Sequence, residues 1–139
     1  MKRVLIDTNV CIDFILRRIP NFADAKIVID EITKGNAQGC ITASMATDIF
    51  YLVQKANSKA FALNALIDIL LILEVLNVYK EDVHSALQSG WNDFEDALQA
   101  TVAEQSGIDA IVTRNCRDYR NAQNIDIVHP QDFIRYLED

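Results

Sequence analysis

Four aspartates that lie far apart in the sequence occupy positions suited to metal chemistry. Asp7 directly follows the apolar run VLI, and Asp118 comes shortly after the run IVT. Asp48 and Asp96 fall within segments that are predicted to be helical. Because open α/β sheets bind ligands beyond the carboxyl ends of their strands, one edge of a sheet can collect all four carboxylates. Such a cluster favours Mg²⁺ or Mn²⁺, and these ions act on phosphate esters.

A pocket of this kind requires a neutralising charge. Two carboxylates about 6 Å apart repel by roughly 3 kcal/mol at an effective dielectric constant near 20. Four of them in one pocket would therefore destabilise the fold unless protons or a cation were bound. The histidines offer no competing zinc site, because His84 and His129 each stand alone in the sequence.

Each aspartate also has a purely structural explanation. Asp7 can end a strand or begin a turn, and Asp118 can pair with a neighbouring arginine. Asp93 and Asp96 together can cap the start of a helix. Asp48 is the hardest to explain in this way, because it borders the apolar positions of its predicted helix and a carboxylate there needs a partner.

Alternating strands and helices are predicted to position these residues. The pattern of apolar residues predicts strands over 2–7, 39–44, 73–78, 109–113 and 125–129. Predicted helices begin near residues 10, 21, 44, 58, 81, 93 and 131, and those that begin at 44 and 58 form a hairpin. Strands separated by helices imply an α/β fold with a parallel sheet and right-handed crossovers. A chain of 139 residues makes one domain, so a single domain is expected over 1–139.

The charge and the apolar pattern exclude some classes of protein. A net charge of −7 argues against a passive nucleic-acid-binding module, because non-specific affinity for nucleic acid comes largely from Lys and Arg. A nucleic-acid substrate would require bound metal to reverse the local field. The longest apolar stretch, 63–76, is too short and too charged for a membrane span of about 20 residues. Without a signal-peptide pattern, and with three cysteines that form no pair motif, the protein is expected to be cytoplasmic and reduced.

Four segments of the sequence resemble the PIN-domain ribonucleases, in particular the VapC-like toxins of bacterial toxin–antitoxin pairs. The segments are VLIDTNV, TASMATDIFYLV, DFEDALQA and IVTRNCRDY, and they follow one another in the expected order over nearly the whole chain. The resemblance implies a three-layer α/β/α fold with a central, mostly parallel five-stranded sheet. It also implies Mg²⁺- or Mn²⁺-dependent hydrolysis of RNA phosphodiester bonds, a homodimer with residues 60–73 as a candidate surface, and a small antitoxin partner.

The resemblance assigns a role to each matching position. It makes Asp7, Asp48, Asp96 and Asp118 the catalytic acids, with Asp7, Asp96 and Asp118 as metal ligands and Asn9, Thr113 and Asn115 as supporting residues. Asp93 is an additional acid one helical turn before Asp96, so which of the two contacts metal stays open, with Asp96 favoured. Arg114 and Arg117 are candidates to hold the substrate phosphate, and Arg17 and Arg18 are alternatives.

Two positions depart from the pattern of the resembled family. Many relatives have Glu at the position of Asp48, and the shorter side chain of Asp would be expected to reach metal through a water molecule. Many have Asp at the position of Asn115, which removes one negative charge. A catalytically weak PIN-like module that acts by associating with protein or RNA therefore remains the alternative. Phosphotransferases with an aspartate nucleophile are disfavoured, because they need a second acid where this chain has Asn9.

Overall fold

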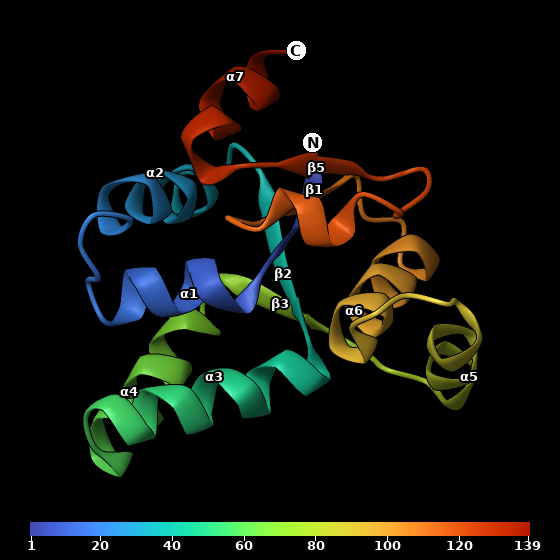
Figure 1. The fold of residues 1–139 in the computed structure, drawn as a ribbon. Helices are drawn as coiled ribbons and strands as arrows, with labels where there is room; N and C mark the ends of the chain where they lie inside the picture. The colour runs from blue at the N-terminus through green and yellow to red at the C-terminus, as the bar shows by residue number, and fades with distance from the viewer.

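Five parallel strands form the centre of the protein, whose computed structural model describes residues 1–139 (Figure 1). The strands are β1 (Arg3–Ile6), β2 (Gln38–Thr42), β3 (Leu73–Leu76), β4 (Ala110–Val112) and β5 (Asp126–Val128). Their order in the sheet is β3-β2-β1-β4-β5, and every neighbouring pair is parallel. The predicted α/β fold is thus confirmed, and its sheet is wholly rather than mostly parallel.

Seven α-helices and two short 3-10 turns connect the strands. The helices are α1 (Thr8–Ile15), α2 (Phe22–Thr33), α3 (Ala43–Ala56), α4 (Lys59–Ile69), α5 (Lys80–Gln88), α6 (Phe94–Gln105) and α7 (Phe133–Glu138). The 3-10 turns are η1 (Cys116–Tyr119) and η2 (Pro130–Asp132). The predicted hairpin is formed by α3 and α4, which pack against each other. No helix is both long enough and apolar enough to cross a bilayer.

The helices form two groups around the sheet (Figure 1). In one group α1 packs against α2 and α3, and α3 packs against α4; in the other α5 packs against α6. The chain moves outward from β1 to β3 and then returns past β1 to β4. Because parallel crossovers are right-handed, this reversal of direction places the two groups of helices on opposite faces.

β1 is apolar after Arg3 and β4 is apolar throughout, because both faces of these central strands are covered. Val4, Leu5 and Ile6 of β1 have no exposed surface, as expected for a parallel sheet between two helical layers. Gly39 of β2 permits a close approach of the neighbouring elements. A Cβ atom there would lie 2.6 Å from Cδ2 of Leu73 and 2.7 Å from Cδ1 of Ile32.

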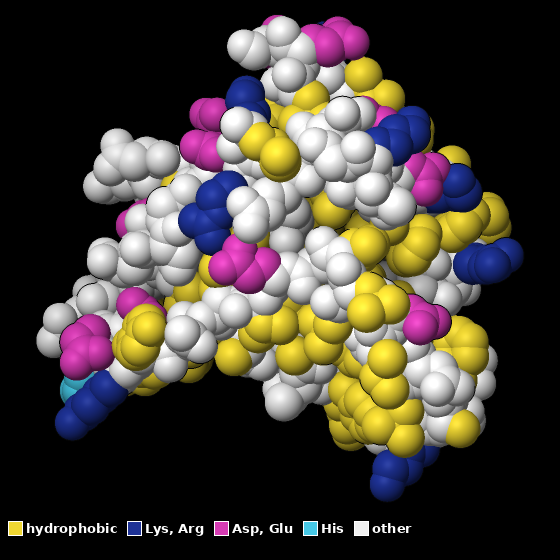
Figure 2. All heavy atoms as spheres, turned by 180° about the vertical axis from the view of Figure 1, so that it is seen from behind, with side chains coloured by type: hydrophobic (Ala, Val, Ile, Leu, Met, Phe, Trp, Pro, Cys, Tyr) yellow, Lys and Arg dark blue, Asp and Glu magenta, His cyan; other side chains and the backbone are white.

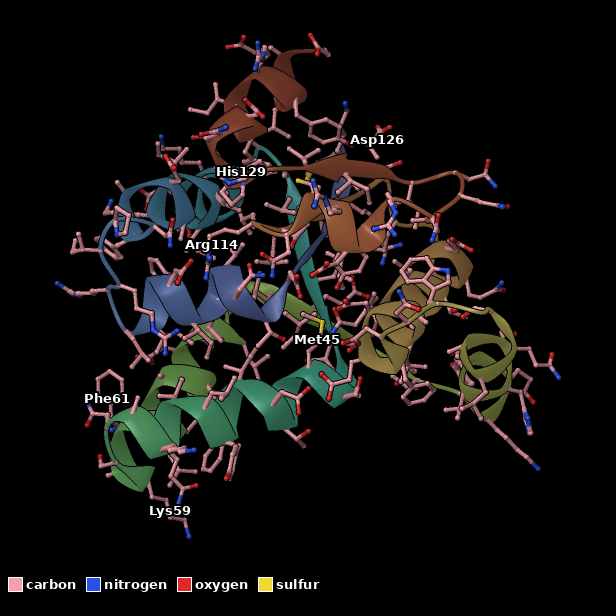
Figure 3. The ribbon with its side chains drawn as sticks, in the orientation of Figure 1. Met45, Lys59, Phe61, Arg114, Asp126 and His129 are labelled. Atoms are coloured by element: carbon pink, nitrogen blue, oxygen red, sulfur yellow. The ribbon has the colours of Figure 1, made fainter.

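The starts of two helices differ in detail from the sequence-based expectation. Thr42, not Ser44, caps α3, because its hydroxyl accepts a hydrogen bond from the backbone N–H of Met45 at 3.1 Å. Met45 itself is buried, where β2 leads into α3 (Figure 3). Asp7 caps α1, accepting from the backbone N–H of Thr8. Asp7 directly follows the last residue of β1, and Thr42 is itself the last residue of β2, so each strand end also fixes a helix start.

Candidate active site

Asp7 lies where the strand order reverses, between β1 and β4, which is the position at which open α/β sheets bind ligands. Its carboxylate is 7% exposed and accepts three hydrogen bonds. Thr113 Oγ1 donates to Oδ2 at 2.7 Å, Asn9 Nδ2 donates to Oδ2 at 3.2 Å, and the Thr8 N–H donates to Oδ1 at 2.8 Å. Burial raises the pKa of Asp7, and the hydrogen bonds from Thr113 and Thr8 oppose the shift. The side chain is therefore held in one orientation.

The start of α6 gives Asp93 and Asp96 different structural roles. Asp93 is the N-cap, and its Oδ1 accepts from the backbone N–H of Asp96 at 2.9 Å. Asp96 stands in the first turn and is half-buried. Burial, together with the charges of Asp93 and Asp7, raises the pKa of Asp96 to about 6. Its carboxylate therefore lies in a site where negative charge is already in excess.

A cavity of about 470 Å³ lies beyond the carboxyl end of β1 and collects residues from several elements. Its volume falls within the range of about 300 to 1,000 Å³ that is typical of ligand pockets. It is lined by Asp7, Thr8, Asn9, Ile12, Arg18, Asp48, Tyr51, Leu52, Glu95, Asp96, Gln99 and Asn115. Three of the four aspartates selected from the sequence, Asp7, Asp48 and Asp96, thus lie in one cavity, hereafter the acidic cavity.

Asp118, the fourth aspartate, lies beside the acidic cavity rather than in its lining. It borders a neighbouring cavity of about 80 Å³ together with Asp93 and Asp96. After burial, its charge is among the causes that raise the pKa of Asp7 and of Asp96. Asp96 lines both cavities and therefore links Asp118 to the main cluster.

Two buried polar residues, Gln99 in the lining of the acidic cavity and its partner Tyr119, were not selected from the sequence. The hydroxyl of Tyr119, a residue with 1% exposure, donates to Oε1 of Gln99 at 2.5 Å. The nearby Tyr119 hydroxyl opposes the rise in the pKa of Asp7 and of Asp96, but burial dominates both shifts and raises both pKa values. Gln99 follows Asp96 by three residues on α6, and that helical spacing was the available signal. No spacing in the sequence points to Tyr119.

Glu95 is a further acid that the sequence did not single out. It lines the acidic cavity, and the charge of Asp48, followed by burial and the charge of Asp93, raises its pKa. The longer side chain of Glu95 thus brings a second carboxylate to the Asp48 side of the cavity. Its position directly before Asp96 was the only signal in the sequence.

The arginines that were candidates for holding phosphate differ in their surroundings. Arg114 lies over α1 in Figure 3, where its Nε donates to Oδ2 of the buried Asp13 at 2.6 Å. Arg117 is exposed and lines neither cavity. Arg18 is the one cation in the lining of the acidic cavity, whereas Arg17 lines a separate groove between α1, α2 and α4. The structure therefore brings Arg18, rather than Arg114 or Arg117, to the acidic residues.

The chemistry of the donor set fits a hard divalent cation. The charged side chains of the acidic cavity are four carboxylates and one guanidinium, and no sulfur or imidazole ligand is among its lining residues. The raised pKa values of Asp7 and Asp96, caused first by burial, indicate charge that a cation would compensate. No group of three or more Asp, Glu, His or Cys side chains is already arranged to hold a metal ion. Binding would therefore have to draw the carboxylates together.

Comparison with proteins of known structure finds the same fold in toxin–antitoxin complexes. A DNA-bound VapBC complex from Salmonella typhimurium contains a chain that is 20% identical, with a TM-score of 0.71 over 94% of this chain and 99% of that one. VapBC2 from Rickettsia felis, bound to a promoter DNA fragment, gives 18% identity and a TM-score of 0.67 over 91% and 98% of the two chains. These likenesses concern the fold.

A third similar structure is Mycobacterium tuberculosis VapC20, described as a toxin that cleaves the sarcin–ricin loop. It is 14% identical, with a TM-score of 0.63 over 78% of this chain and 86% of that one. No curated protein matches the sequence closely enough to serve as a relative. The sequence model of the PIN domain matches residues 3–117, which include β1 through the first half of η1 and every residue of the acidic cavity. The chain therefore belongs to the PIN-domain family.

Proposed function

We propose that the protein is a Mg²⁺- or Mn²⁺-dependent endoribonuclease and the toxin of a toxin–antitoxin pair. The observation that carries the proposal is the convergence of Asp7, Asp48 and Asp96 in one cavity at the switch point of the sheet. Structural neighbours at low identity include a toxin described as cleaving an RNA loop. PIN domains are typically nucleases, which supports the same reaction class.

Asp7, Asp96 and Asp118 are the residues proposed to hold the metal. A bound divalent ion would supply an activated water and would neutralise charge that develops on the phosphodiester. Thr113 and Asn9 fix the Asp7 carboxylate by donating hydrogen bonds to it, and the buried Tyr119 hydroxyl donates to Gln99, which lines the same cavity. Asp93 serves as the cap that sets the first turn of α6, which favours Asp96 as the direct ligand.

The proposed partners follow from the neighbours and from the charge of the chain. Chains with the same fold occur in VapBC complexes from Rickettsia felis and Salmonella typhimurium and in a toxin–antitoxin complex from Klebsiella pneumoniae. A small antitoxin that presents a basic side chain to the acidic cavity would complement its excess of carboxylates. A homodimer is proposed through residues 60–73, whose exposed apolar side chains lie on and just after α4.

A second candidate function is a PIN-like module that acts by association without catalysis. It is favoured by one observation, the absence of three acidic side chains already positioned for a metal ion. The shortened acid at Asp48 and the amide at Asn115 would weaken metal binding in this case. The two functions differ in whether Mn²⁺ binds and RNA is cut.

Mn²⁺ titration by calorimetry on the wild type and on Asp96→Asn, followed by incubation with a mixed pool of structured RNA, separates the two functions. Asp93→Asn is the matched control, because Asn also caps helices and the change removes the same charge one turn away. Binding and cleavage should both disappear in Asp96→Asn and persist in Asp93→Asn. A wild type that binds no metal at millimolar Mn²⁺ would contradict the enzymatic function and leave the association module.

A further inference from the structure

The rim of the acidic cavity carries one exposed aromatic side chain and one unpaired cation. Tyr51 is 63% exposed and lies one turn after Asp48 on α3. Arg18 lies in the connection between α1 and α2, and its guanidinium makes no ion pair. Both residues line the cavity that contains Asp7 and Asp96. Two groups that suit a base and a phosphate therefore flank the proposed metal ligands.

The backbone at both positions is well fixed although the side chains are free. The N–H of Arg18 donates to the carbonyl of Asp13 at 3.0 Å, and its carbonyl accepts from the N–H of Phe22 at 2.7 Å. Tyr51 is in the middle of the fourteen-residue helix α3. A large aromatic ring left in water at a rigid position is a suitable stacking platform, because little backbone ordering is needed when it is covered.

The charge distribution decides where a nucleic acid would be held. Arg18 is the sole cation in the lining, against the four acids Asp7, Asp48, Glu95 and Asp96. With metal bound among the acids, a phosphate would be attracted to the region between the metal and Arg18. Tyr51 lines the same cavity and supplies an exposed ring for a base attached to that phosphate.

Base stacking on an aromatic side chain requires a base outside a duplex. In a double helix each base is covered by its neighbours, whereas unpaired bases in loops and single strands expose both faces. We propose that the acidic cavity takes an unpaired ribonucleotide, with its base stacked on Tyr51 and its phosphate held by Arg18. The inference rests on the proposed metal-dependent nuclease function and specifies the kind of substrate for that site.

The test measures binding of a fluorescein-labelled pool of short single-stranded RNA by anisotropy, with Ca²⁺ replacing Mn²⁺ to limit cleavage, and compares duplexes of the same strands. Tyr51→Ala should weaken single-strand binding about tenfold, the order of effect expected for one stacked base. Tyr51→Phe keeps the ring and should retain binding. Arg18→Gln should weaken binding and reduce the slope of log K against log salt by roughly 0.7.

Two matched controls lie outside the acidic cavity. Tyr79→Ala removes a tyrosine of similar exposure, 59%, at the start of α5. Arg17→Gln removes the neighbouring arginine, which lines the other groove. Both controls should bind RNA like the wild type, and all of the variants should keep wild-type Mn²⁺ affinity in calorimetry, because none of them supplies a proposed ligand.

Photocrosslinking with RNA that contains 5-iodouridine supplies a positional readout, since a base stacked on Tyr51 should yield a crosslinked peptide from α3. Unchanged RNA binding in Tyr51→Ala, with normal Mn²⁺ binding, would overturn this inference alone. Preference of the wild type for duplex would do the same, as would a Tyr51→Ala variant that loses only self-association. A wild type that binds neither Mn²⁺ nor RNA would overturn the proposed function and this inference with it.

Discussion

At the scale of single residues, the acidic cavity combines carboxylates of unequal freedom. Asp7 is buried and held by three donors, whereas Asp96 is half-buried, and burial with the charges of Asp93 and Asp7 raises its pKa to about 6. The Tyr119 phenol, which donates its proton to Gln99, adds no charge of either sign beside these acids. Without a bound cation, the repulsion among these carboxylates and their burial destabilise the ionised forms. The raised pKa of Asp96 is one consequence.

The pKa of Asp96 predicts how stability depends on pH. Burial and the charges of Asp93 and Asp7, with a smaller contribution from Asp118, raise the pKa to about 6, against about 3.9 for an unfolded aspartate. Between these values the folded state binds more protons than the unfolded state, so stability falls as pH rises. The pKa of Asp7 is also raised, chiefly by burial, and acts in the same direction. The metal-free protein should therefore melt at a higher temperature near pH 5 than near pH 8.

Mn²⁺ should reverse this dependence, because metal binds the deprotonated carboxylates. Stabilisation by Mn²⁺ should be largest above about pH 6 and should fade as pH drops through that value. Scanning calorimetry with EDTA and with Mn²⁺ across this range measures both trends. In Asp96→Asn the slope of the metal-free curve should be smaller. Equal metal-free slopes in the variant and the wild type would show that Asp96 does not carry the dependence.

At the scale of elements, the site depends on segments that are brought together over long stretches of chain. Asp13 on α1 and Arg114 after β4 are 101 residues apart in sequence and form an ion pair in which Asp13 is 1% exposed. The N–H of Arg114 also donates to Oδ1 of Asn9 at 3.4 Å. The pair thus joins α1 to the loop that leads from Thr113 to Asp118.

Removing the Arg114 guanidinium should destabilise the fold, because it leaves a buried carboxylate without a partner. Arg114→Met is expected to lower the free energy of unfolding by about 3 kcal/mol, at the low end for buried pairs because Arg114 is partly exposed. Combining it with Asp13→Leu should restore most of the loss. Arg117→Met, at an exposed position, should change stability by less than about 0.5 kcal/mol. Urea denaturation measures all four proteins, and similar losses in the two arginine variants would contradict a structural role for Arg114.

The order of elements could be predicted from the sequence because buried parallel strands are continuous apolar runs and helices have a different period. The same logic located Asp7 after β1, and helical periodicity located Asp48 and Asp96. Asp7, Asp48 and Asp96 line one cavity because of the topology of the sheet. The alternation of strands and helices in the sequence largely determines that topology. Helix starts were less accurate, since both Thr42 and Ser44 are good caps and only the strand end selects Thr42.

The directions of side chains and the contacts between distant residues could not be predicted from the sequence. Arg114 has an acid nearby in sequence at Asp118, but it pairs with Asp13 on a different element. Arg18 enters the acidic cavity because of the path of the loop between α1 and α2, and a neighbouring Arg17 with the same chemistry enters another groove. Tyr119 meets Gln99 across 20 residues. None of these contacts leaves a periodic signal, because each depends on the packed positions of separate elements.

At the scale of the whole molecule, one surface remains uncovered. Exposed apolar side chains gather over the α3–α4 hairpin, at the lower right of Figure 2. On and just after α4 they are Leu63 at 46%, Ile67 at 61%, Leu70 at 40% and Leu71 at 80% exposure. Contiguous apolar surface of this kind marks an interaction site, and residues 60–73 were the candidate surface for a homodimer. The apolar contact must act against repulsion between two chains that each carry a net charge of −7.

This opposition predicts both the effect of mutation and the effect of salt on self-association. Ile67→Glu places a charge in the middle of the apolar surface and should convert dimers to monomers in sedimentation velocity experiments. Leu87→Glu, at a residue of similar exposure, 65%, on α5, should leave the dimer intact.

Because salt screens the repulsion between like-charged chains but not the apolar contact, the wild-type dimer should tighten as ionic strength rises. A wild type that stays monomeric at high salt and high concentration would show that this surface serves a different partner, and a dimer weakened by salt would place charged pairs, not α4, at the interface.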